Sequence, residues 1–349
     1  MNTQYATSDT AVLGQPVVDP ADWTAHDLER RKDWLYQVTP KEASALIKLA
    51  EQIKPKLNGD PSQLLKLSKA TFDLGAFTKT FASLRRQLSA GLGFALIRGL
   101  PTEGLDKLSM AIIYWALGQH LGKARSNNPD GDLIGHVTDL GKTQADPKSR
   151  GYQTREAMDY HCDQSSIVGL LCIRRAKVGG TSKIASSVSV YNTLLERSPE
   201  SVSLLAQPLC WTKHGEANEG EVGFYRSPVF NFLAGRLCVA FGPRHIVKGH
   251  ALPGAPKLTP SQLRALALCE EIAEEQHFEM DFRPGDAQFL NNYVVLHTRT
   301  AYTDWPEADR RRLLWRLWLL DPSIRPATDY VRQWSAGVRL EKTVERIVL

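Results

Sequence analysis

The chain has 349 residues, of which 42% are hydrophobic and 23% charged, and its formal net charge is +5. This composition is ordinary for a globular protein in water, and the scattered basic residues argue against a nucleic-acid-binding surface. No apolar run approaches the roughly 18 residues of a membrane span, and residues 1–14 lack a signal-peptide pattern, so we expect a cytoplasmic protein without a membrane partner.

The five cysteines are odd in number and include no Cys-x-x-Cys pair. This argues against a disulfide framework and against a structural zinc site, and it favours a reducing compartment. The length suits one large domain or two small ones. We expect a single domain over residues 1–349; the sequence leaves the oligomeric state open.

The first part of the chain reads as mainly helical. Thr39-Pro40-Lys41-Glu42 is a capping box that predicts a helix over 40–54. Apolar spacing predicts a second helix ending near Gly91 or Gly93, then a buried strand over 93–99 and a buried helix over 105–121. Two polar stretches, 124–132 and 141–156, are expected loops. The second is either a lid or plain exposed chain.

Short strands dominate from residue 158 onward. The expected elements are a strand carrying His161, a strand over 167–173, a turn at 178–182, an extended segment over 183–190, a helix over 191–206, a loop over 213–223, a strand over 237–241 and a helix after the capping box at 259–262.

His161 and Asp163 are the first candidate metal ligands. On an extended strand, side chains two residues apart point to the same face. An imidazole beside a carboxylate is two thirds of the facial triad that binds non-haem Fe(II). His-x-Asp alone is weak evidence, because the pair also occurs by chance on surfaces and in cores.

His297 is the candidate for the third ligand. It lies near the end of the second of two strands that follow the turn Pro284-Gly285-Asp286 and are joined by Asn291-Asn292. Taken alone, a buried strand histidine without a ligand role would explain it equally well.

The last predicted strand, 312–320, is apolar enough to be buried on both sides. Leu313, Leu317 and their alternating neighbours form one apolar face, whereas the other face carries Arg312 and Arg316. Buried arginine is costly unless it is paired. The planar guanidinium suits a carboxylate, either from the protein or from a bound anion.

This combination of His-x-Asp, a distant histidine and Arg-Arg-x-x-x-Arg resembles the Fe(II)/2-oxoglutarate-dependent dioxygenases of the taurine dioxygenase and clavaminate synthase-like family. The resemblance runs from about Gly93 to Pro322. It implies that His161, Asp163 and His297 bind Fe(II), with 2-oxoglutarate and O2 as co-substrates.

The resemblance also implies a site for 2-oxoglutarate. Arg312 would hold its distal carboxylate, with Arg311 as the fallback if the register differs by one residue. Ser182 matches a hydroxyl residue that assists this arginine, and Thr181 is the alternative because the turn reads Gly179-Gly180-Thr181-Ser182.

The family fold is mixed α+β with a mainly β core, a double-stranded β-helix or jelly roll with flanking helices. Here it implies a helical part over about 30–122, a jelly-roll core over about 93–322 and a C-terminal extension over 323–349. Members oxidise small molecules, converting 2-oxoglutarate to succinate and carbon dioxide. We therefore expect an enzyme that hydroxylates an aliphatic C–H bond of a small molecule. The presence of Asp163 argues against halogenation, because related halogenases have Gly or Ala there.

Three residues are candidates for contact with substrate. Arg316 shares a face with Arg312, and in several relatives the equivalent arginine contacts an acidic group, which predicts an anionic or amino-acid-like substrate. The alternative is that Arg316 pairs with a protein acid or with 2-oxoglutarate itself. His136 and Asn292 are weaker candidates, since Asn292 could instead satisfy a turn. Arg299 is expected to be a structural ion-pair partner. The remaining histidines show no ligand-like spacing and are expected to have no functional role: His26, His120, His214, His245, His250 and His277.

Two other classes of function remain open. One is a catalytically silent barrel that binds 2-oxoglutarate or metal, and the other is a different metal-dependent enzyme, such as a hydrolase or isomerase, on a cupin-like barrel. The first would not turn over 2-oxoglutarate. The second would not need the two inward arginines and would work without oxygen.

Overall fold

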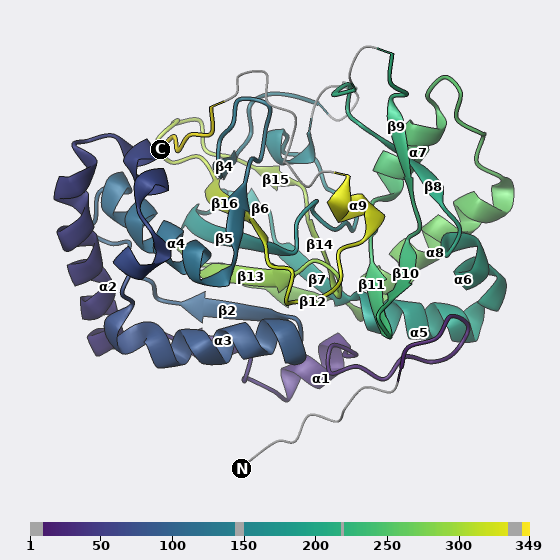
Figure 1. The fold of residues 1–349 in the computed structure, drawn as a ribbon, viewed down its shortest axis with the longest axis horizontal. Helices are drawn as coiled ribbons and strands as arrows, with labels where there is room; N and C mark the ends of the chain where they lie inside the picture. The colour runs from purple at the N-terminus through teal and green to yellow at the C-terminus, as the bar shows by residue number, and fades with distance from the viewer. Residues whose placement is uncertain (1–9, 144–149, 218–219, 334–343) are drawn as a thin grey trace.

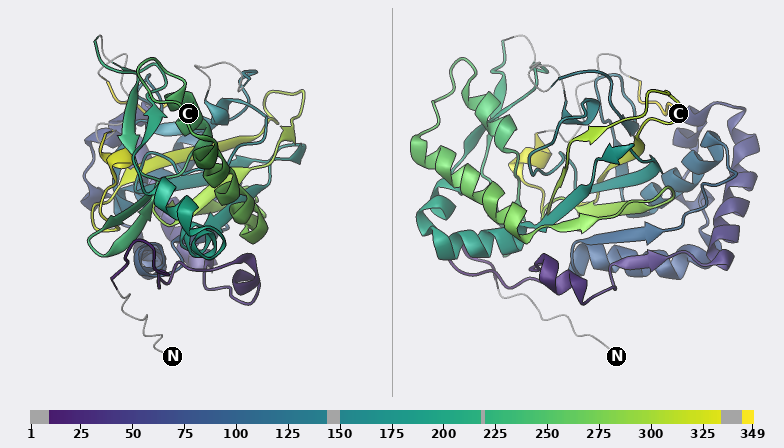
Figure 2. Two further views of the ribbon diagram at one scale, coloured as in Figure 1. Left: turned by 90° about the vertical axis from the view of Figure 1, so that its right-hand side faces the viewer. Right: turned by 180° about the vertical axis from the view of Figure 1, so that it is seen from behind.

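The computed structural model describes residues 10–143, 150–217, 220–333 and 344–349. Strands occupy the middle of the molecule and helices gather at its two ends (Figure 1), which is also visible from behind (Figure 2). The fold is thus mixed α+β with several sheets, as the sequence predicted. Within the described ranges, no helix has both the length and the apolar character needed to cross a membrane.

The principal sheet has seven strands and runs through the centre. Its order is β1 (Leu35–Gln37), β2 (Phe94–Arg98), β13 (Ala287–Asn291), β5 (Ile167–Arg174), β16 (Leu313–Leu320) and β3 (Lys123–Arg125), with β4 (Ile134–Val137) also paired to β16. The β1–β2 pair is parallel and the other pairs are antiparallel.

Four smaller sheets complete the β structure. They are β12 (Phe278–Met280), β7 (Ser182–Ser186) and β14 (Val295–Arg299) in one three-stranded sheet, and the pairs β10 (Phe230–Leu233) with β11 (Arg236–Val239), β15 (Tyr302–Thr303) with β6 (Val178–Gly179), and β8 (Leu209–Thr212) with β9 (Phe224–Ser227).

The helices form two groups. Near one end lie α2 (Pro40–Ile53), α3 (Thr78–Ala90) and α4 (Lys107–Leu121). Near the other end lie α5 (Ser187–Arg197), α6 (Pro199–Leu205), α7 (Pro243–His250) and α8 (Pro260–Gln276). The short elements are α1 (Ala25–Glu29), α9 (Asp329–Arg332) and the 3₁₀ turns Lys54–Leu57, Pro61–Lys66, Lys69–Thr71, Gly75–Phe77 and Gly151–Gln153. The capping box predicted for α2 is present, because Thr39 Oγ1 accepts from the Glu42 N–H and Glu42 accepts from the Thr39 N–H.

Strand β16 is buried on both faces, as its sequence predicted, except for the half-buried Leu320. Its apolar face packs on α4, where a side chain at Gly118 would collide with Leu317 and the Tyr114 hydroxyl donates to the Trp315 carbonyl at 3.2 Å. The absence of a side chain at Gly118 therefore allows β16 to pack closely against α4. The opposite face of the strand presents Arg316 and Trp318 to a cavity.

Three expectations about individual elements are wrong. The segment 183–190 is not extended to its end, because Ser186 closes β7 and caps α5 by accepting from the Ser189 N–H at 3.0 Å. The expected helix over 191–206 is two helices, because Pro199 lacks the N–H that would continue α5 and instead begins α6. The expected loop over 124–132 begins inside β3.

Helix α7 was not predicted, and it packs tightly on β8. Gly249 lies so close to that strand that a Cβ atom would be 2.4 Å from the Cys210 carbonyl oxygen. The Cys210 N–H also donates to His250 Nε2 at 2.9 Å, while His250 Nδ1 donates to the Pro256 carbonyl at 2.6 Å. These contacts fix α7, which forms one wall of the cavity described below.

Gly249→Ala is therefore expected to destabilise the protein. The added methyl group cannot be accommodated without moving backbone, so the free energy of unfolding in urea should fall by about 1–3 kcal/mol. Val247→Ala in the same helix is the control: Val247 is 45% exposed, and its replacement should change stability by no more than about 0.5 kcal/mol. Equal unfolding curves for the two variants would contradict the close packing of α7 on β8.

Candidate active site

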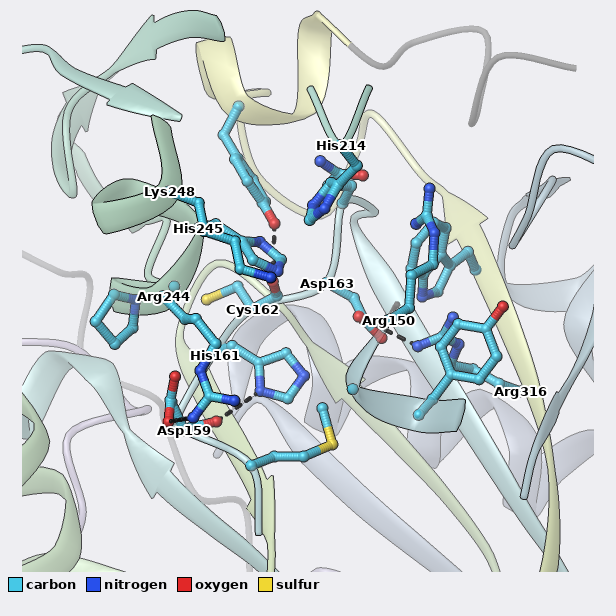
Figure 3. A pocket seen from close by; sticks show the side chains of 18 residues that line it. Arg150, Asp159, His161, Cys162, Asp163, His214, Arg244, His245, Lys248 and Arg316 are labelled. Atoms are coloured by element: carbon cyan, nitrogen blue, oxygen red, sulfur yellow. Dashed lines mark hydrogen bonds and ion pairs between the residues drawn. The ribbon is translucent and has the colours of Figure 1, made fainter. Parts of the chain in front are cut away.

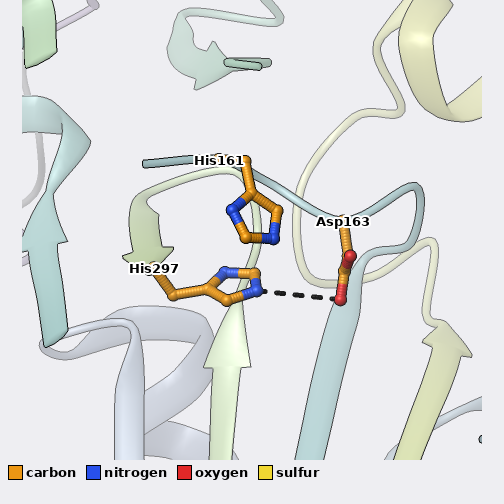
Figure 4. Close-up of side chains that lie close together, drawn as sticks. All are labelled: His161, Asp163 and His297. Atoms are coloured by element: carbon orange, nitrogen blue, oxygen red, sulfur yellow. Dashed lines mark ion pairs between the residues drawn. The ribbon is translucent and has the colours of Figure 1, made fainter. Parts of the chain in front are cut away.

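The structure brings His161, Asp163 and His297 together (Figure 4). Their potential ligand atoms all lie within 4.8 Å of one another, and His297 Nε2 is 3.7 Å from Asp163 Oδ2. His297 lies in the middle of β14, and the other two side chains come from the segment that precedes β5. Among the described residues this is the one group of three or more such side chains with metal-site spacing.

The His161–Asp163 segment is not a strand, contrary to the sequence-based expectation. His161 makes an isolated bridge to His297, with both N–H···O distances at 3.0 Å, and regular pairing stops there. Asp163 is placed by a turn instead, because Asn292 Oδ1 accepts from its N–H at 3.3 Å and Asn292 Nδ2 donates to Ser165 at 3.0 Å. A turn held by side chains gives no periodic signal in the sequence.

The protonation of these side chains suits a divalent metal. His161 Nδ1 lies 2.8 Å from the Asp159 carbonyl, which can only accept, so Nδ1 donates and Nε2 is the nitrogen that faces a metal. Burial would raise the pKa of Asp163, but the Arg316 guanidinium and the two histidines outweigh it and lower the pKa to about 2. Burial, aided by His161, lowers the pKa of His297 to about 3.

Near neutral pH the triad therefore offers the carboxylate of Asp163 and the neutral imidazole of His297, next to the His161 ring held by the Asp159 carbonyl. Asp163 Oδ2 and His297 Nδ1 are buried without a hydrogen-bond partner among the described residues. Buried polar atoms are normally paired, so these two atoms are suited to a ligand from outside the chain. The donor set fits Fe(II) in a facial triad with open coordination positions.

A cavity lies beside the triad, and most of its charged side chains are basic (Figure 3). Its wall consists of Arg150, Gly151, Tyr152, Met158, Asp159, His161, Cys162, Asp163, Gln164, His214, Gly242, Pro243, Arg244, His245, Lys248, Arg316, Trp318 and Tyr330. The two acids in this wall, Asp159 and Asp163, are both paired with arginines.

Arg316 reaches this cavity but already has protein partners. Its Nε donates to Asn127 Oδ1 at 2.8 Å, and its Nη1 lies 3.5 Å from Asp163 Oδ1. The guanidinium also stacks between the rings of Tyr152 and Trp318, at 4.7 and 4.5 Å from their centroids. The alternative of an internal acid partner is thus what the structure shows, so Arg316 by itself no longer indicates the charge of a substrate.

Arg312 and Arg311 have different surroundings. Arg312 is 4% exposed, and its Nη1 has no hydrogen-bond partner among the described residues. It lines a second cavity together with Gly180 and Thr181, whereas Ser182 is buried in β7 and is not part of that wall. Arg311 is exposed and donates to the backbone carbonyls of Trp305 and Pro306.

Two of the expected substrate contacts lie elsewhere. His136 stacks on Trp315, on the face of β16 opposite Arg316, and its Nε2 contacts the Val348 carbonyl at 3.1 Å, so it lines neither cavity. Asn292 is buried and supports the turn that carries Asp163. Arg299, expected in an ion pair, instead donates to the carbonyl of Thr154 at 2.7 Å.

The proposed lid is partly anchored. Residues 144–149 lie outside the described residues. In the part that follows them, Tyr152 and Thr154 are buried, and the bond from Arg299 holds the Thr154 carbonyl. The polar composition of 141–156 concealed these contacts. A lid role for this loop stays a prediction.

Sequence reasoning missed the basic side chains on the far wall of the cavity. His214 and His245 were assigned no functional role, yet both line the cavity, as do Lys248 and Arg150. They come from the β8–β9 connection, from α7 and from the 150–152 segment, which no sequence motif links. The one local signal was the spacing of His245 and Lys248, three residues apart and therefore on one helix face.

Comparison with known proteins adds an independent line of evidence. A family model described as "Taurine catabolism dioxygenase TauD, TfdA family" matches residues 58–318. FR-33289 synthase from Streptomyces rubellomurinus is 33% identical over 317 residues, which cover 88% of this chain and 91% of that protein. Taurine hydroxylase-like protein SAT17 from Stachybotrys chartarum is 28% identical over 272 residues, or 74% of this chain and 69% of that protein.

Solved structures show the same fold. Asparagine oxygenase in complex with Fe(II), hydroxyasparagine and succinate matches with a TM-score of 0.65 at 17% identity, covering 84% of this chain and 97% of that one. The non-haem iron oxygenase OrfP, in complex with Fe, succinate and (3S)-hydroxy-L-Arg, matches with a TM-score of 0.62 at 16% identity, covering 88% and 99%.

Asn292→Ala should weaken Fe(II) binding without removing a ligand. Loss of the amide frees the turn that positions Asp163, and loss of such an outer-shell contact typically costs about 10–100-fold in metal affinity. Anaerobic Fe(II) titration measures the effect. Asn291→Ala is the control, because Asn291 is equally buried but its amide donates to the Leu88 carbonyl. It should lower stability and leave the Fe(II) affinity of the folded protein unchanged; equal affinities in both variants would refute the positioning role.

Proposed function

The chain belongs to the TauD, TfdA family of dioxygenases and is an enzyme that uses Fe(II) and 2-oxoglutarate, and from this premise we propose that it hydroxylates an aliphatic C–H bond of a small anionic or amino-acid-like metabolite. The observation that carries the proposal is the convergence of two imidazoles and one carboxylate beside a cavity rich in basic groups.

His161, Asp163 and His297 would hold the iron. With O2 and 2-oxoglutarate, the bound metal supplies the oxidation of a C–H bond, coupled to formation of succinate and carbon dioxide. The chain's own contribution is positional: the Asp159 carbonyl orients His161, Asn292 holds the turn of Asp163, and Arg316 balances the buried carboxylate.

Arg312 would bind the distal carboxylate of 2-oxoglutarate, with Thr181 beside it. The buried guanidinium with an unpartnered Nη1 supports this role, since such a group requires an anion to offset its burial. Arg311 is the weaker candidate, because its side chain is exposed and bonded to backbone carbonyls.

For the fold, the proposal is a double-stranded β-helix within one domain. The principal sheet and the β12–β7–β14 sheet both contribute to the ligand site, through the segment before β5 and through β14. One hydrophobic cluster also extends from Val17 to Ile347, with members in both groups of helices and in the strands between them.

The substrate class rests on two observations. The similar oxygenases of known structure contain hydroxylated asparagine or arginine as bound molecules. The cavity beside the triad has basic side chains that are not all balanced by acids. An oxygen-independent metal enzyme does not account for the buried Arg312, and a silent barrel that binds 2-oxoglutarate is distinguished by the absence of turnover.

Fe(II)-dependent turnover tests the function directly. The Fe(II)-loaded enzyme with a panel of amino acids and small organic anions should convert 2-oxoglutarate to succinate in air but not anaerobically, and mass spectrometry should find one added oxygen in the true substrate. His297→Ala should abolish both products because it removes a metal ligand. Product formation without oxygen, or full activity in His297→Ala, would reject the proposal.

Arg312→Ala should raise the Michaelis constant for 2-oxoglutarate. Loss of a charge-assisted contact of about 1.5–3 kcal/mol corresponds to roughly 10–150-fold. Arg311→Ala, which removes the adjacent exposed guanidinium, is the matched control and should leave this constant nearly unchanged. A larger effect in Arg311→Ala would move the 2-oxoglutarate site to that residue.

A further inference from the structure

Four basic side chains from three separate segments line the same cavity (Figure 3). Arg150 precedes the 3₁₀ turn Gly151–Gln153, His214 lies between β8 and β9, and His245 and Lys248 share a face of α7. The rings of His214 and His245 touch edge to face, with centroids 4.5 Å apart. We refer to these four residues as the basic cluster.

The backbone at His214 is held in an uncommon conformation. Its φ is +53°, in the left-handed region that non-glycine residues rarely adopt, and its N–H donates to Thr212 Oγ1 at 3.0 Å. Such conformations persist where the surrounding structure imposes them, and they are concentrated at functional sites. Here the conformation accompanies a side chain that lies in the cavity wall beside His245.

Lys248 is the charged member of the basic cluster that has no acidic partner among the described residues. Elsewhere in the cavity wall Arg244 pairs with Asp159 at 2.7 Å, and Arg316 pairs with Asp163. Within the cluster, Arg150 pairs with Glu216, but Lys248 makes no ion pair with any described residue. Burial, reinforced by Arg150 and Lys248, lowers the pKa of His214 to about 3, and burial together with His214 lowers that of His245. Burial is the main cause of both pKa shifts, so near neutral pH the two rings are neutral hydrogen-bonding groups.

We propose that the basic cluster is an oxyanion site, which binds the acidic group of the substrate and thereby holds the remainder of the molecule toward the triad. That the bound anion belongs to a substrate rests on the proposed function, whereas the existence of the anion site does not. The proposal relocates the determinant of substrate charge from Arg316, which is occupied by Asp163, to Lys248 and its neighbours.

Lys248 is half-buried and has no acidic partner among the described residues, and it lines the cavity together with two imidazoles. Such a group gains most from an anion that accepts hydrogen bonds from several directions. The donors of Lys248, His214 and His245 come from α7 and the β8–β9 connection rather than from one arginine fork, and Arg150 is already paired with Glu216. A carboxylate and a tetrahedral oxyanion share the required chemistry, and they differ in how many of these donors they can engage at once.

Calorimetric titration of the Fe(II)·2-oxoglutarate enzyme under nitrogen, at constant ionic strength, tests the proposal with sulfate and acetate as probes. At least one probe should bind, and Lys248→Met should weaken that binding on the order of 10-fold or more. Lys248→Arg should restore it. Tighter binding of sulfate would identify a tetrahedral group, and tighter binding of acetate a carboxylate.

Arg244→Met is the matched control, because it removes one positive charge from the same helix and the same cavity wall, but one already paired with Asp159. It should change probe affinity by less than about 3-fold, since a general field is screened by salt while a direct contact is not. The proposal is overturned if neither probe binds, if Lys248→Met and Arg244→Met weaken binding equally, or if His297→Ala rather than Lys248→Met removes it, which would place the anion on the metal.

The binding experiment separates this proposal from the proposed function. Probe binding that depends on Lys248, in an enzyme that forms no succinate with any compound tested, would retain the anion site and reject the oxygenase activity. Succinate formation with no probe binding would retain the oxygenase activity and reject the anion site.

Discussion

The reciprocal backbone hydrogen bonds between His161 and His297 are the constraint on which the site depends. Each residue donates to and accepts from the other at 3.0 Å, so the two imidazoles start from adjacent backbone positions, and their ring centroids are 4.3 Å apart. Because β14 is held by β7 on its other side, the bridge attaches the irregular ligand segment to a regular sheet. A metal site requires its ligand atoms to be placed precisely, and this attachment fixes the position of the irregular segment through the regular sheet beside it.

Charge balance in the ligand segment imposes a second constraint. Asp163 is buried, and a buried carboxylate is stable only when it is paired. Arg316 supplies that pairing from β16, and Asn127 and two aromatic rings hold the guanidinium in place. The strand pattern predicted an inward arginine that needs an anion, and Asp163 supplies that anion from within the chain.

The sequence predicted what is periodic or local. The apolar alternation of β16, the capping boxes at Thr39 and Thr259, and the residue types of the triad all matched the structure or its family. It could not predict what depends on tertiary contact. The turn at Asp163 rests on Asn292, far along the chain, and the basic cluster joins three segments without a shared motif.

The packing of helix α7 on β8 determines where the side chains of the basic cluster lie. Gly249 brings its backbone against β8, and the bond from the Cys210 N–H to His250 fixes its rotation. With the helix fixed on that side, His245 and Lys248 lie on the face that lines the cavity. The β8–β9 pair carries His214 and is the same element on which α7 packs, so one structural unit positions three of the four basic side chains. Of the three triad residues, His297 lies in β14 and the other two in the irregular segment before β5. Arg244 of α7 pairs with Asp159, whose carbonyl contacts His161 Nδ1, so this unit also supports the segment that carries the triad.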